Sequence, residues 1–243
     1  MIARSSDRAP DGQLGALFRA IADGDSARVE RLITASPPLA SEPSRTGASR
    51  AKAAPFYVEQ IGHHIYTGDT ALHFAAAAYQ ASIARDLLAR GASVAAKNRR
   101  SAEPLHYACD GSPGSRRWNP AAQTATIECL LTAGANPNAT DRSGVTPLHR
   151  AVRTRCAAAV RSLLEHGANA RQLNARGSTP LHLAVQTTGR GGSGGAEARE
   201  QQAEIVRLLI AHGARATDRG ARGKTVAASV SSVWLSELLK ERD

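Results

Sequence analysis

Apolar side chains recur at helical spacing in four separate segments of the chain. In each segment they lie three to four positions apart or adjacent, the pattern that lines one face of an α-helix. The positions are Ile83, Leu87 and Leu88; Ile127, Leu130 and Leu131; Val160, Leu163 and Leu164; and Ile205, Val206, Leu208 and Leu209. Each segment ends in Gly-Ala, with the glycine at Gly91, Gly134, Gly167 and Gly213. Because glycine closes a helix in the left-handed conformation, the pattern predicts four helices that end at these points.

A shorter helix is predicted before each of these four, at near-copies of one phrase. The copies are Thr70-Ala71-Leu72-His73, Glu103-Pro104-Leu105-His106, Thr146-Pro147-Leu148-His149 and Thr179-Pro180-Leu181-His182. A Thr hydroxyl caps a helix, a proline fits the first turn, and the leucine is the first residue that faces the core. The histidines lie 33, 43 and 33 residues apart, and a degraded fifth copy begins at Thr225. The chain is therefore predicted to consist of helix pairs repeating every 33 residues, with inserts in two of them.

With this period and this phrase the chain resembles the ankyrin repeat family. The resemblance implies an all-α fold, an ankyrin-repeat solenoid of helix-turn-helix units with projecting β-turn fingers. It also implies that the phrase histidines form hydrogen bonds to the neighbouring unit, and that partners bind a concave surface made by the fingers and first helices. The units are expected at about residues 66–98, 99–141, 142–174 and 175–220.

The two ends of the array are expected to carry caps, because each terminal unit exposes one face to water. The segment before the first unit has no apolar periodicity and is rich in Ser, Arg and Ala, so it is interpreted as a flexible insert. The expected organisation is a disordered tail at 1–10, an N-terminal capping helix pair at 11–40, the flexible insert at 41–55, and ankyrin repeats over 56–243 that include a C-terminal cap at 221–243.

The chain is basic, with a formal net charge of +10 over 243 residues. A charge of this sign favours either a nucleic acid or an acidic protein as partner. Only four of the 31 basic residues are lysine, so an alternative is that arginine abundance reflects a GC-rich genome and only keeps the surface soluble. No zinc finger, recognition helix or aromatic-studded sheet motif is visible, so a nucleic acid is not the expected partner.

Cysteine usage and hydropathy predict a cytoplasmic location. The chain has three cysteines, which cannot pair completely and are interpreted as small buried side chains in a reducing compartment. No run approaches the roughly 18 apolar residues of a membrane span, and the polar N-terminus lacks the apolar run of a signal peptide. We therefore expect a cytoplasmic monomer with no membrane association.

Neither a catalytic site nor a cofactor or metal site is expected. Packed helices lie roughly 8–10 Å apart, too far for histidines of successive units to share a zinc ion with ligands at about 2 Å. The run from Gly189 to Gly194 spells G-x-G-x-x-G, but it follows a helix rather than a strand and is interpreted as a flexible loop. The sequence also lacks Gly-x-Ser-x-Gly, His-Glu-x-x-His and paired carboxylates on an apolar helix face. The chain is therefore expected not to be an enzyme.

The resemblance places the partner-binding residues in the variable slots after each phrase and at the finger tips. These candidates are Phe74, Tyr107, Arg150, Arg153, Leu183, Gln186, Arg99, Arg100, Arg142 and Arg176. Aromatic residues and arginines are enriched at interface hot spots, which favours a protein partner with an acidic surface. RNA binding through the arginine-bearing fingers is the alternative. The inserts at 110–120 and 189–201 are expected on the rim opposite the fingers, and the sequence leaves their role open.

Overall fold

The computed structural model describes residues 12–111, 118–186 and 195–240. Regular structure within these ranges is almost entirely helical, with one short antiparallel hairpin between β1 (Tyr57–Val58) and β2 (His63–His64). The contacts divide the chain into two compact units, the first comprising Met1–Ala108 and Gly114–Asn136 and the second Cys109–Pro113 and Pro137–Asp243. The disordered tail expected at residues 1–10 lies outside the described residues.

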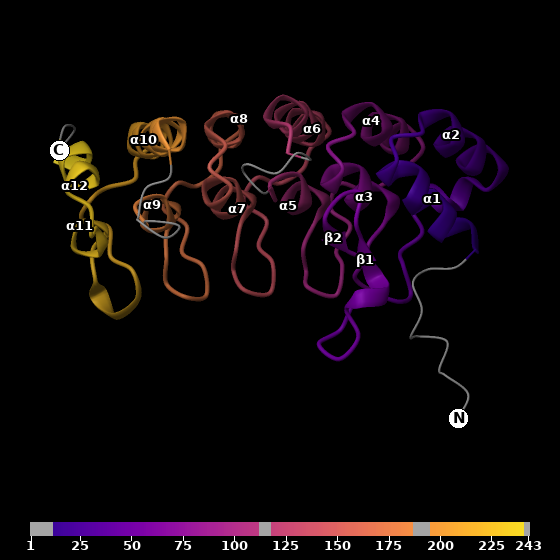
Figure 1. Ribbon diagram of the computed structural model, residues 1–243, viewed down its shortest axis with the longest axis horizontal. Helices are drawn as coiled ribbons and strands as arrows, with labels where there is room; N and C mark the ends of the chain where they lie inside the picture. The colour runs from indigo at the N-terminus through magenta and orange to yellow at the C-terminus, as the bar shows by residue number, and fades with distance from the viewer. Residues whose placement is uncertain (1–11, 112–117, 187–194, 241–243) are drawn as a thin grey trace. The chain divides into compact units, whose positions relative to one another are not determined.

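The described part of the first unit contains three consecutive helix pairs, drawn in indigo to magenta in Figure 1. Helix α3 packs between α1 and α5, and α4 packs against α6. The leucines at positions 17, 72, 87, 105 and 130 are completely buried between these helices. The pairs are α1 (Gly12–Ala22) with α2 (Ser26–Ala35), α3 (Ala71–Ala77) with α4 (Ala81–Ala89), and α5 (Pro104–Ala108) with α6 (Pro120–Thr132).

The segment expected to be a flexible insert, residues 41–55, is anchored to the first finger. Ala48 is buried and its N–H donates to the carbonyl of Ile65 at 2.7 Å. The backbone at Gly47 comes so close that an added Cβ would lie 2.2 Å from the nitrogen of Thr67. Small residues therefore allow a close backbone approach here, which a polar composition alone does not reveal. The 3-10 helices η2 (Pro37–Ala40) and η3 (Ala54–Phe56) lie at the ends of this segment.

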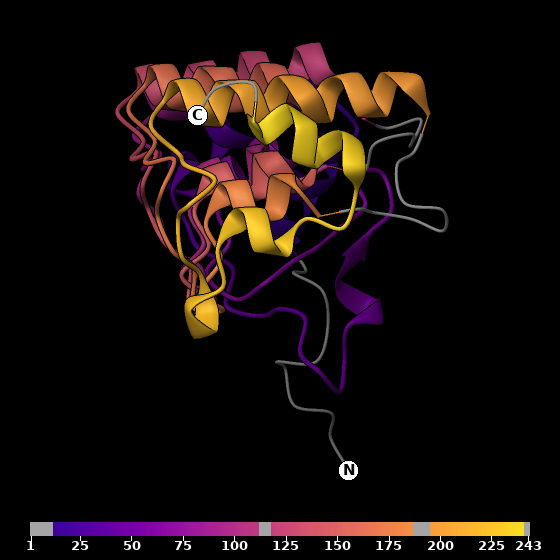
Figure 2. The same cartoon turned by 90° about the vertical axis from the view of Figure 1, so that its left-hand side faces the viewer.

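The second unit has the same organisation as the first. Its first helices α7, α9 and α11 pack in that order, and its second helices pack in the order α8, α10 and α12 (Figure 1). Loops before the first helices project together on one side, as Figure 2 shows with this unit facing the viewer. The helices are α7 (Pro147–Arg153), α8 (Ala157–Glu165), α9 (Pro180–Ala184), α10 (Ala196–Ala211), α11 (Val226–Ser229) and α12 (Val233–Lys240), with the 3-10 helix η4 (Ala221–Gly223) in the last loop.

The helices begin and end at the residues that the sequence pattern identified. The hydroxyls of Thr146, Thr179 and Thr225 each accept the N–H of the residue three positions on, at 3.4, 3.3 and 3.2 Å, and so cap α7, α9 and α11. The four glycines of the Gly-Ala pairs have φ between 85° and 92°, the left-handed conformation that ends a helix. Paired helices stacked in rows within each unit confirm the all-α fold.

Candidate functional site

Three of the projecting fingers share one internal hydrogen-bond pattern. In each of these three, one side-chain oxygen accepts two backbone N–H groups, two and four residues further along the chain. Asn98 accepts from residues 100 and 102 at 2.8 and 3.1 Å, Asp141 from residues 143 and 145 at 2.8 and 3.1 Å, and Asn174 from residues 176 and 178 at 2.9 and 3.1 Å. Because each turn is fixed by its own side chain, the residues at the tips are presented in a defined direction.

Neighbouring fingers within each unit are joined by backbone hydrogen bonds. In the first unit the N–H of Arg99 donates to the carbonyl of Thr67 at 2.7 Å. In the second unit the N–H of Ala175 donates to the carbonyl of Ser143 at 2.9 Å. Gly144 permits this approach, because its φ is +65° and an added Cβ would lie 2.9 Å from the nitrogen of Ala175. The fingers of each unit therefore form a connected row.

The phrase histidines bridge successive repeats, as the resemblance implied. The Nε2 atoms of His73, His149 and His182 contact the carbonyls of Ala102, Ser178 and Lys224 at 3.1, 3.0 and 3.4 Å. Each Nδ1 accepts the N–H of the capping threonine at 3.1 to 3.3 Å, so the ring proton lies on Nε2 and is donated across the repeat. Burial lowers the pKa of His73 and of His149, and their imidazoles are therefore neutral.

The four candidate arginines on the fingers are all exposed. Arg99 and Arg100 lie at one finger of the first unit, and Arg142 and Arg176 lie at successive fingers of the second. In the part of the chain that the structure describes, the guanidinium groups of Arg142 and Arg176 have no hydrogen-bond or ion-pair partner. These four side chains remain candidates for contact with a partner.

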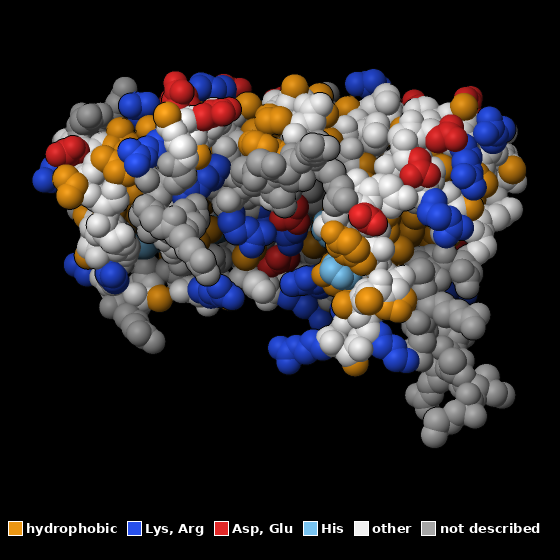
Figure 3. All heavy atoms as spheres, in the orientation of Figure 1, with side chains coloured by type: hydrophobic (Ala, Val, Ile, Leu, Met, Phe, Trp, Pro, Cys, Tyr) orange, Lys and Arg blue, Asp and Glu red, His pale blue; other side chains and the backbone are white. Residues whose placement is uncertain are grey.

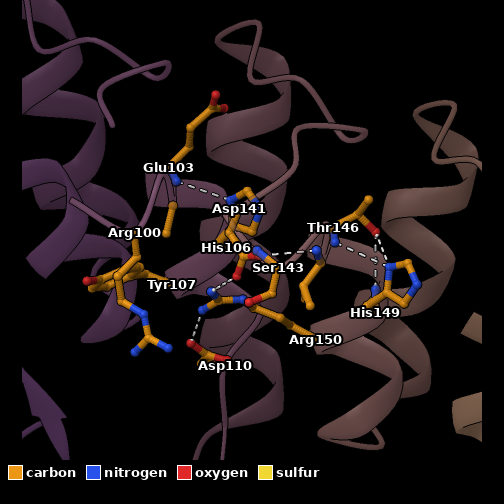
Figure 4. A network of polar contacts seen from close by, with 12 residues as sticks. Arg100, Glu103, His106, Tyr107, Asp110, Asp141, Ser143, Thr146, His149 and Arg150 are labelled. Atoms are coloured by element: carbon orange, nitrogen blue, oxygen red, sulfur yellow. Dashed lines mark hydrogen bonds and ion pairs between the residues drawn. The ribbon is translucent and has the colours of Figure 1, made fainter. Parts of the chain in front are cut away.

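Arg150 was expected on the partner-binding surface, but its side chain is largely buried. Its side chain is only 12% exposed and forms ion pairs with Asp110 at 2.5 Å and Asp141 at 3.0 Å (Figure 4). Burial lowers the pKa of Arg150, but the two carboxylates more than offset this effect and the net pKa is raised. Arg153 contacts the second oxygen of Asp110 at 3.2 Å while its side chain stays 68% exposed. Arg150 is therefore an internal cation, whereas Arg153 is still accessible.

Phe74 and Tyr107 were expected on the binding surface, but both are interior residues. Phe74 is 1% exposed and stacks on Phe18 of α1 with ring centroids 4.0 Å apart. Tyr107 is 2% exposed, and its hydroxyl lies 2.8 Å from a carboxylate oxygen of the buried Asp69. The capping helix α1 covers the first ring and the anchored first finger covers the second. Neither ring can contact a partner in this conformation.

The other two slot residues remain near the surface. Leu183 is half-buried, and Gln186 is exposed although its backbone carbonyl accepts a hydrogen bond from Arg155 at 3.1 Å.

The described residues 110, 111 and 118–120 represent only the ends of the first insert. Within it, the indole N–H of Trp118 donates to Gln123 at 2.9 Å. The Gly189 to Gly194 phrase lies outside the described residues.

Sequence reasoning missed a group of aromatic side chains next to two of the finger arginines. The hairpin pairs Tyr57 with His64, and their rings lie 5.0 Å apart. Tyr66 follows the hairpin and has both Arg99 and Arg100 near its ring. The sequence signal was the aromatic content of residues 56–66, although the pairing that gathers these rings depends on the fold.

Among the described residues no three His, Cys, Asp or Glu side chains are arranged to hold a metal ion. No helix formed by these residues is long and apolar enough to cross a membrane. The cysteines are reduced, with Cys109 and Cys156 buried and Cys129 partly exposed.

Comparison with family models gives two matches, and together they cover more than half of the chain. A model of three ankyrin repeats matches residues 120–219, and a model of the single ankyrin repeat matches residues 67–99. A search of curated proteins gives no match. The matched ranges cover parts of both units, and with the stacked helix pairs they confirm the expected solenoid fold.

Proposed function

Because the chain belongs to the ankyrin repeat family, whose repeats are generally scaffolds for protein–protein interaction, we propose that it is a non-catalytic scaffold for a protein with an acidic surface. In each unit, the surface that binds this partner is formed by the finger tips and the adjoining first helices. The proposal includes a cytoplasmic location and a monomeric state, in keeping with three reduced cysteines.

One observation carries the proposal: exposed arginines lie on rigid turns. Arg99, Arg100, Arg142 and Arg176 are exposed on fingers whose backbones are fixed by Asn98, Asp141 and Asn174. A guanidinium offers several donors in a planar arrangement that matches a carboxylate. Since the turns are already ordered, binding loses less conformational entropy than it would on mobile loops. Arg150 is not part of this surface, because Asp110 and Asp141 already neutralise it.

The test is selection from a random-peptide display library with the full chain at physiological salt. We expect enriched peptides to be acidic. Replacing all four finger arginines with glutamate should weaken their binding by about tenfold or more, since each reversal places like charges together. A matched control replaces with glutamate four exposed arginines that lie on second helices or at their ends. These are Arg31, Arg85, Arg90 and Arg207.

Two results would contradict the proposal. One is enrichment of neutral or basic peptides, and the other is equal loss of affinity in the finger variant and the control. The RNA alternative is tested on the same proteins by filter binding across a salt series. Tight binding of a mixed RNA pool that survives excess heparin and is lost in the finger variant would favour RNA over a protein partner.

A further inference from the structure

A surface of the first unit combines three aromatic rings with two arginines. We call it the aromatic–arginine surface and define it as Tyr57, His64, Tyr66, Arg99 and Arg100. Ring centroids of Tyr57 and His64 are 5.0 Å apart, and those of His64 and Tyr66 are 6.4 Å apart. The guanidinium carbons of Arg99 and Arg100 lie 5.4 and 5.1 Å from the centre of the Tyr66 ring. The five side chains therefore form one continuous group.

Both guanidinium groups are held in place by neutral partners. Each lies within the roughly 6 Å at which a cation is attracted to an aromatic face. Arg99 also donates from Nη2 to the carbonyl of Ala48, in the segment that packs on this finger. Arg100 donates from Nη1 to the hydroxyl of Tyr66 at 3.1 Å. An arginine has five N–H donors, so most of the donors of this pair remain for a ligand.

No carboxylate neutralises this pair among the residues that the structure describes. Arg150 and Arg171 of the second unit differ from this pair, because each contacts a carboxylate, Arg171 at 2.6 Å from Asp218. Two adjacent cations repel one another unless an anion lies between or beside them. From this contrast we infer that the aromatic–arginine surface binds two neighbouring carboxylates in an acidic peptide segment of the partner, a site that rests on the proposed protein-binding function.

The rings beside the arginines give the site an apolar component. Tyr57 is 46% exposed, one of the few large hydrophobic side chains that are exposed in the described residues. His64 is half-buried beside it, and burial together with His63 lowers its pKa, so it adds an uncharged ring. Figure 3 shows hydrophobic side chains and histidine gathered over the hairpin, with Lys and Arg side chains next to them. The fitting segment therefore carries an apolar or aromatic residue next to its carboxylates.

The ring geometry disfavours a single-stranded nucleic acid as the occupant. Bases bind such surfaces by stacking on free aromatic faces. Here the guanidinium groups of Arg99 and Arg100 already lie over Tyr66. Tyr57 and His64 are tilted by 54° against one another at 5.0 Å, which leaves no parallel gap for a base.

The experiment measures fluorescence anisotropy of a labelled peptide that has two adjacent glutamates followed by phenylalanine. The full chain should bind it, and a peptide with glutamines in place of the glutamates should bind about tenfold or more weakly. The variant R99Q/R100Q should show the same loss for the glutamate peptide. The control R85Q/R90Q removes the same charge from exposed positions on α4 and at its end, outside the fingers, and should bind within about twofold of the parent.

A second variant protects the test against misfolding, because Arg99 and Arg100 contact neighbouring residues. Tyr57→Ser changes only the exposed ring, and it should abolish the preference for phenylalanine over serine in the third peptide position. The inference fails if R99Q/R100Q binds the glutamate peptide as tightly as the parent does. If R142Q/R176Q loses this binding instead, the proposed function still stands. If no acidic peptide binds the full chain, both proposals fail. Polyuridine and the glutamine peptide are also added as competitors of the glutamate peptide. If polyuridine competes more strongly than the glutamine peptide does, the assignment to a peptide is wrong.

Discussion

At the scale of single residues, the phrase histidines act as neutral double hydrogen-bonding groups. His149 accepts the N–H of Thr146 at 3.2 Å on Nδ1 and contacts the carbonyl of Ser178 at 3.0 Å through Nε2. A protonated Nδ1 could no longer accept this hydrogen bond, and the imidazole would carry a charge in an almost completely buried site. Burial is the main cause of the lowered pKa of this imidazole. His73 has the same arrangement in the first unit.

Because these histidines are buried and neutral, we expect the folded chain to be less stable in mild acid than at neutral pH. The unfolded imidazole has a pKa near 6.5 and the folded one a lower value. Below about 6.5 the unfolded state therefore binds more protons, so stability is complete above this pH and falls as the pH drops towards the folded pKa. Urea unfolding at pH 7.5 and 5.5 should show a lower free energy of unfolding at the lower pH. Asp141 titrates outside this window, because its pKa is held below the ordinary value of an aspartate.

A pair of glutamine variants separates this effect from general acid sensitivity. His149→Gln removes one buried titrating group, so the drop between the two pH values should become smaller than in the parent. His212→Gln removes a histidine that is exposed at the end of α10 and should leave the drop unchanged. An equal drop in all three proteins would show that the buried imidazoles do not govern the acid response.

At the scale of elements, Arg150 links the start of the first insert to a finger and to α7. Asp110 follows α5 in the sequence, Asp141 belongs to the finger turn, and Arg150 lies on α7 (Figure 4). The carboxylate of Asp141 also accepts two backbone N–H groups of its turn. Burial raises the pKa of Asp141, but these hydrogen bonds and Arg150 outweigh it and the net pKa is lowered. The cluster therefore stabilises the finger.

Removing the internal cation should weaken the fold more than removing its exposed neighbour. We expect Arg150→Leu to lower the free energy of unfolding by about 3–5 kcal/mol, because two carboxylates lose a nearly buried partner. Arg153→Leu should change it by about 0–1 kcal/mol, as is usual for an exposed ion pair. Urea unfolding at pH 7.5 measures both. Similar values for the two variants would mean that Arg150 is not a structural residue.

The repeat pattern correctly predicted residues whose contacts lie within one repeat or between adjacent repeats. It failed for residues that are covered by elements outside the repeat. Thr146, Leu148 and His149 were identified correctly because their contacts lie within one repeat or between adjacent repeats. Phe74 and Tyr107 occupy the same slot as Arg150 and Leu183. The capping helix α1 covers Phe74 in the first repeat, and the anchored first finger covers Tyr107 in the second. The partner of Arg150, Asp110, lies 40 residues away in a non-repeated insert. A period alone cannot indicate such contacts.

At the scale of the whole molecule, each unit is stabilised by contacts between neighbouring helices. In the first unit α3 packs on α1, α4 and α5, and in the second α7 packs on α8 and α9. Stability in such arrays is approximately a sum over repeats and their adjoining surfaces. A defect introduced at one position should therefore have its greatest effect on adjacent repeats and a smaller effect on distant ones.

Two core substitutions at equivalent positions test this directly. Leu72 in α3 and Leu148 in α7 are both completely buried, so changing either to alanine should cost about 2–5 kcal/mol. Amide hydrogen exchange should show accelerated exchange mainly in α1, α3, α4 and α5 for Leu72→Ala, and mainly in α7, α8 and α9 for Leu148→Ala. If the two variants accelerate exchange in different helices, each helix is stabilised mainly by the helices next to it. If both variants accelerate exchange equally in all helices, the chain unfolds as one cooperative block and the sum over repeats does not describe it.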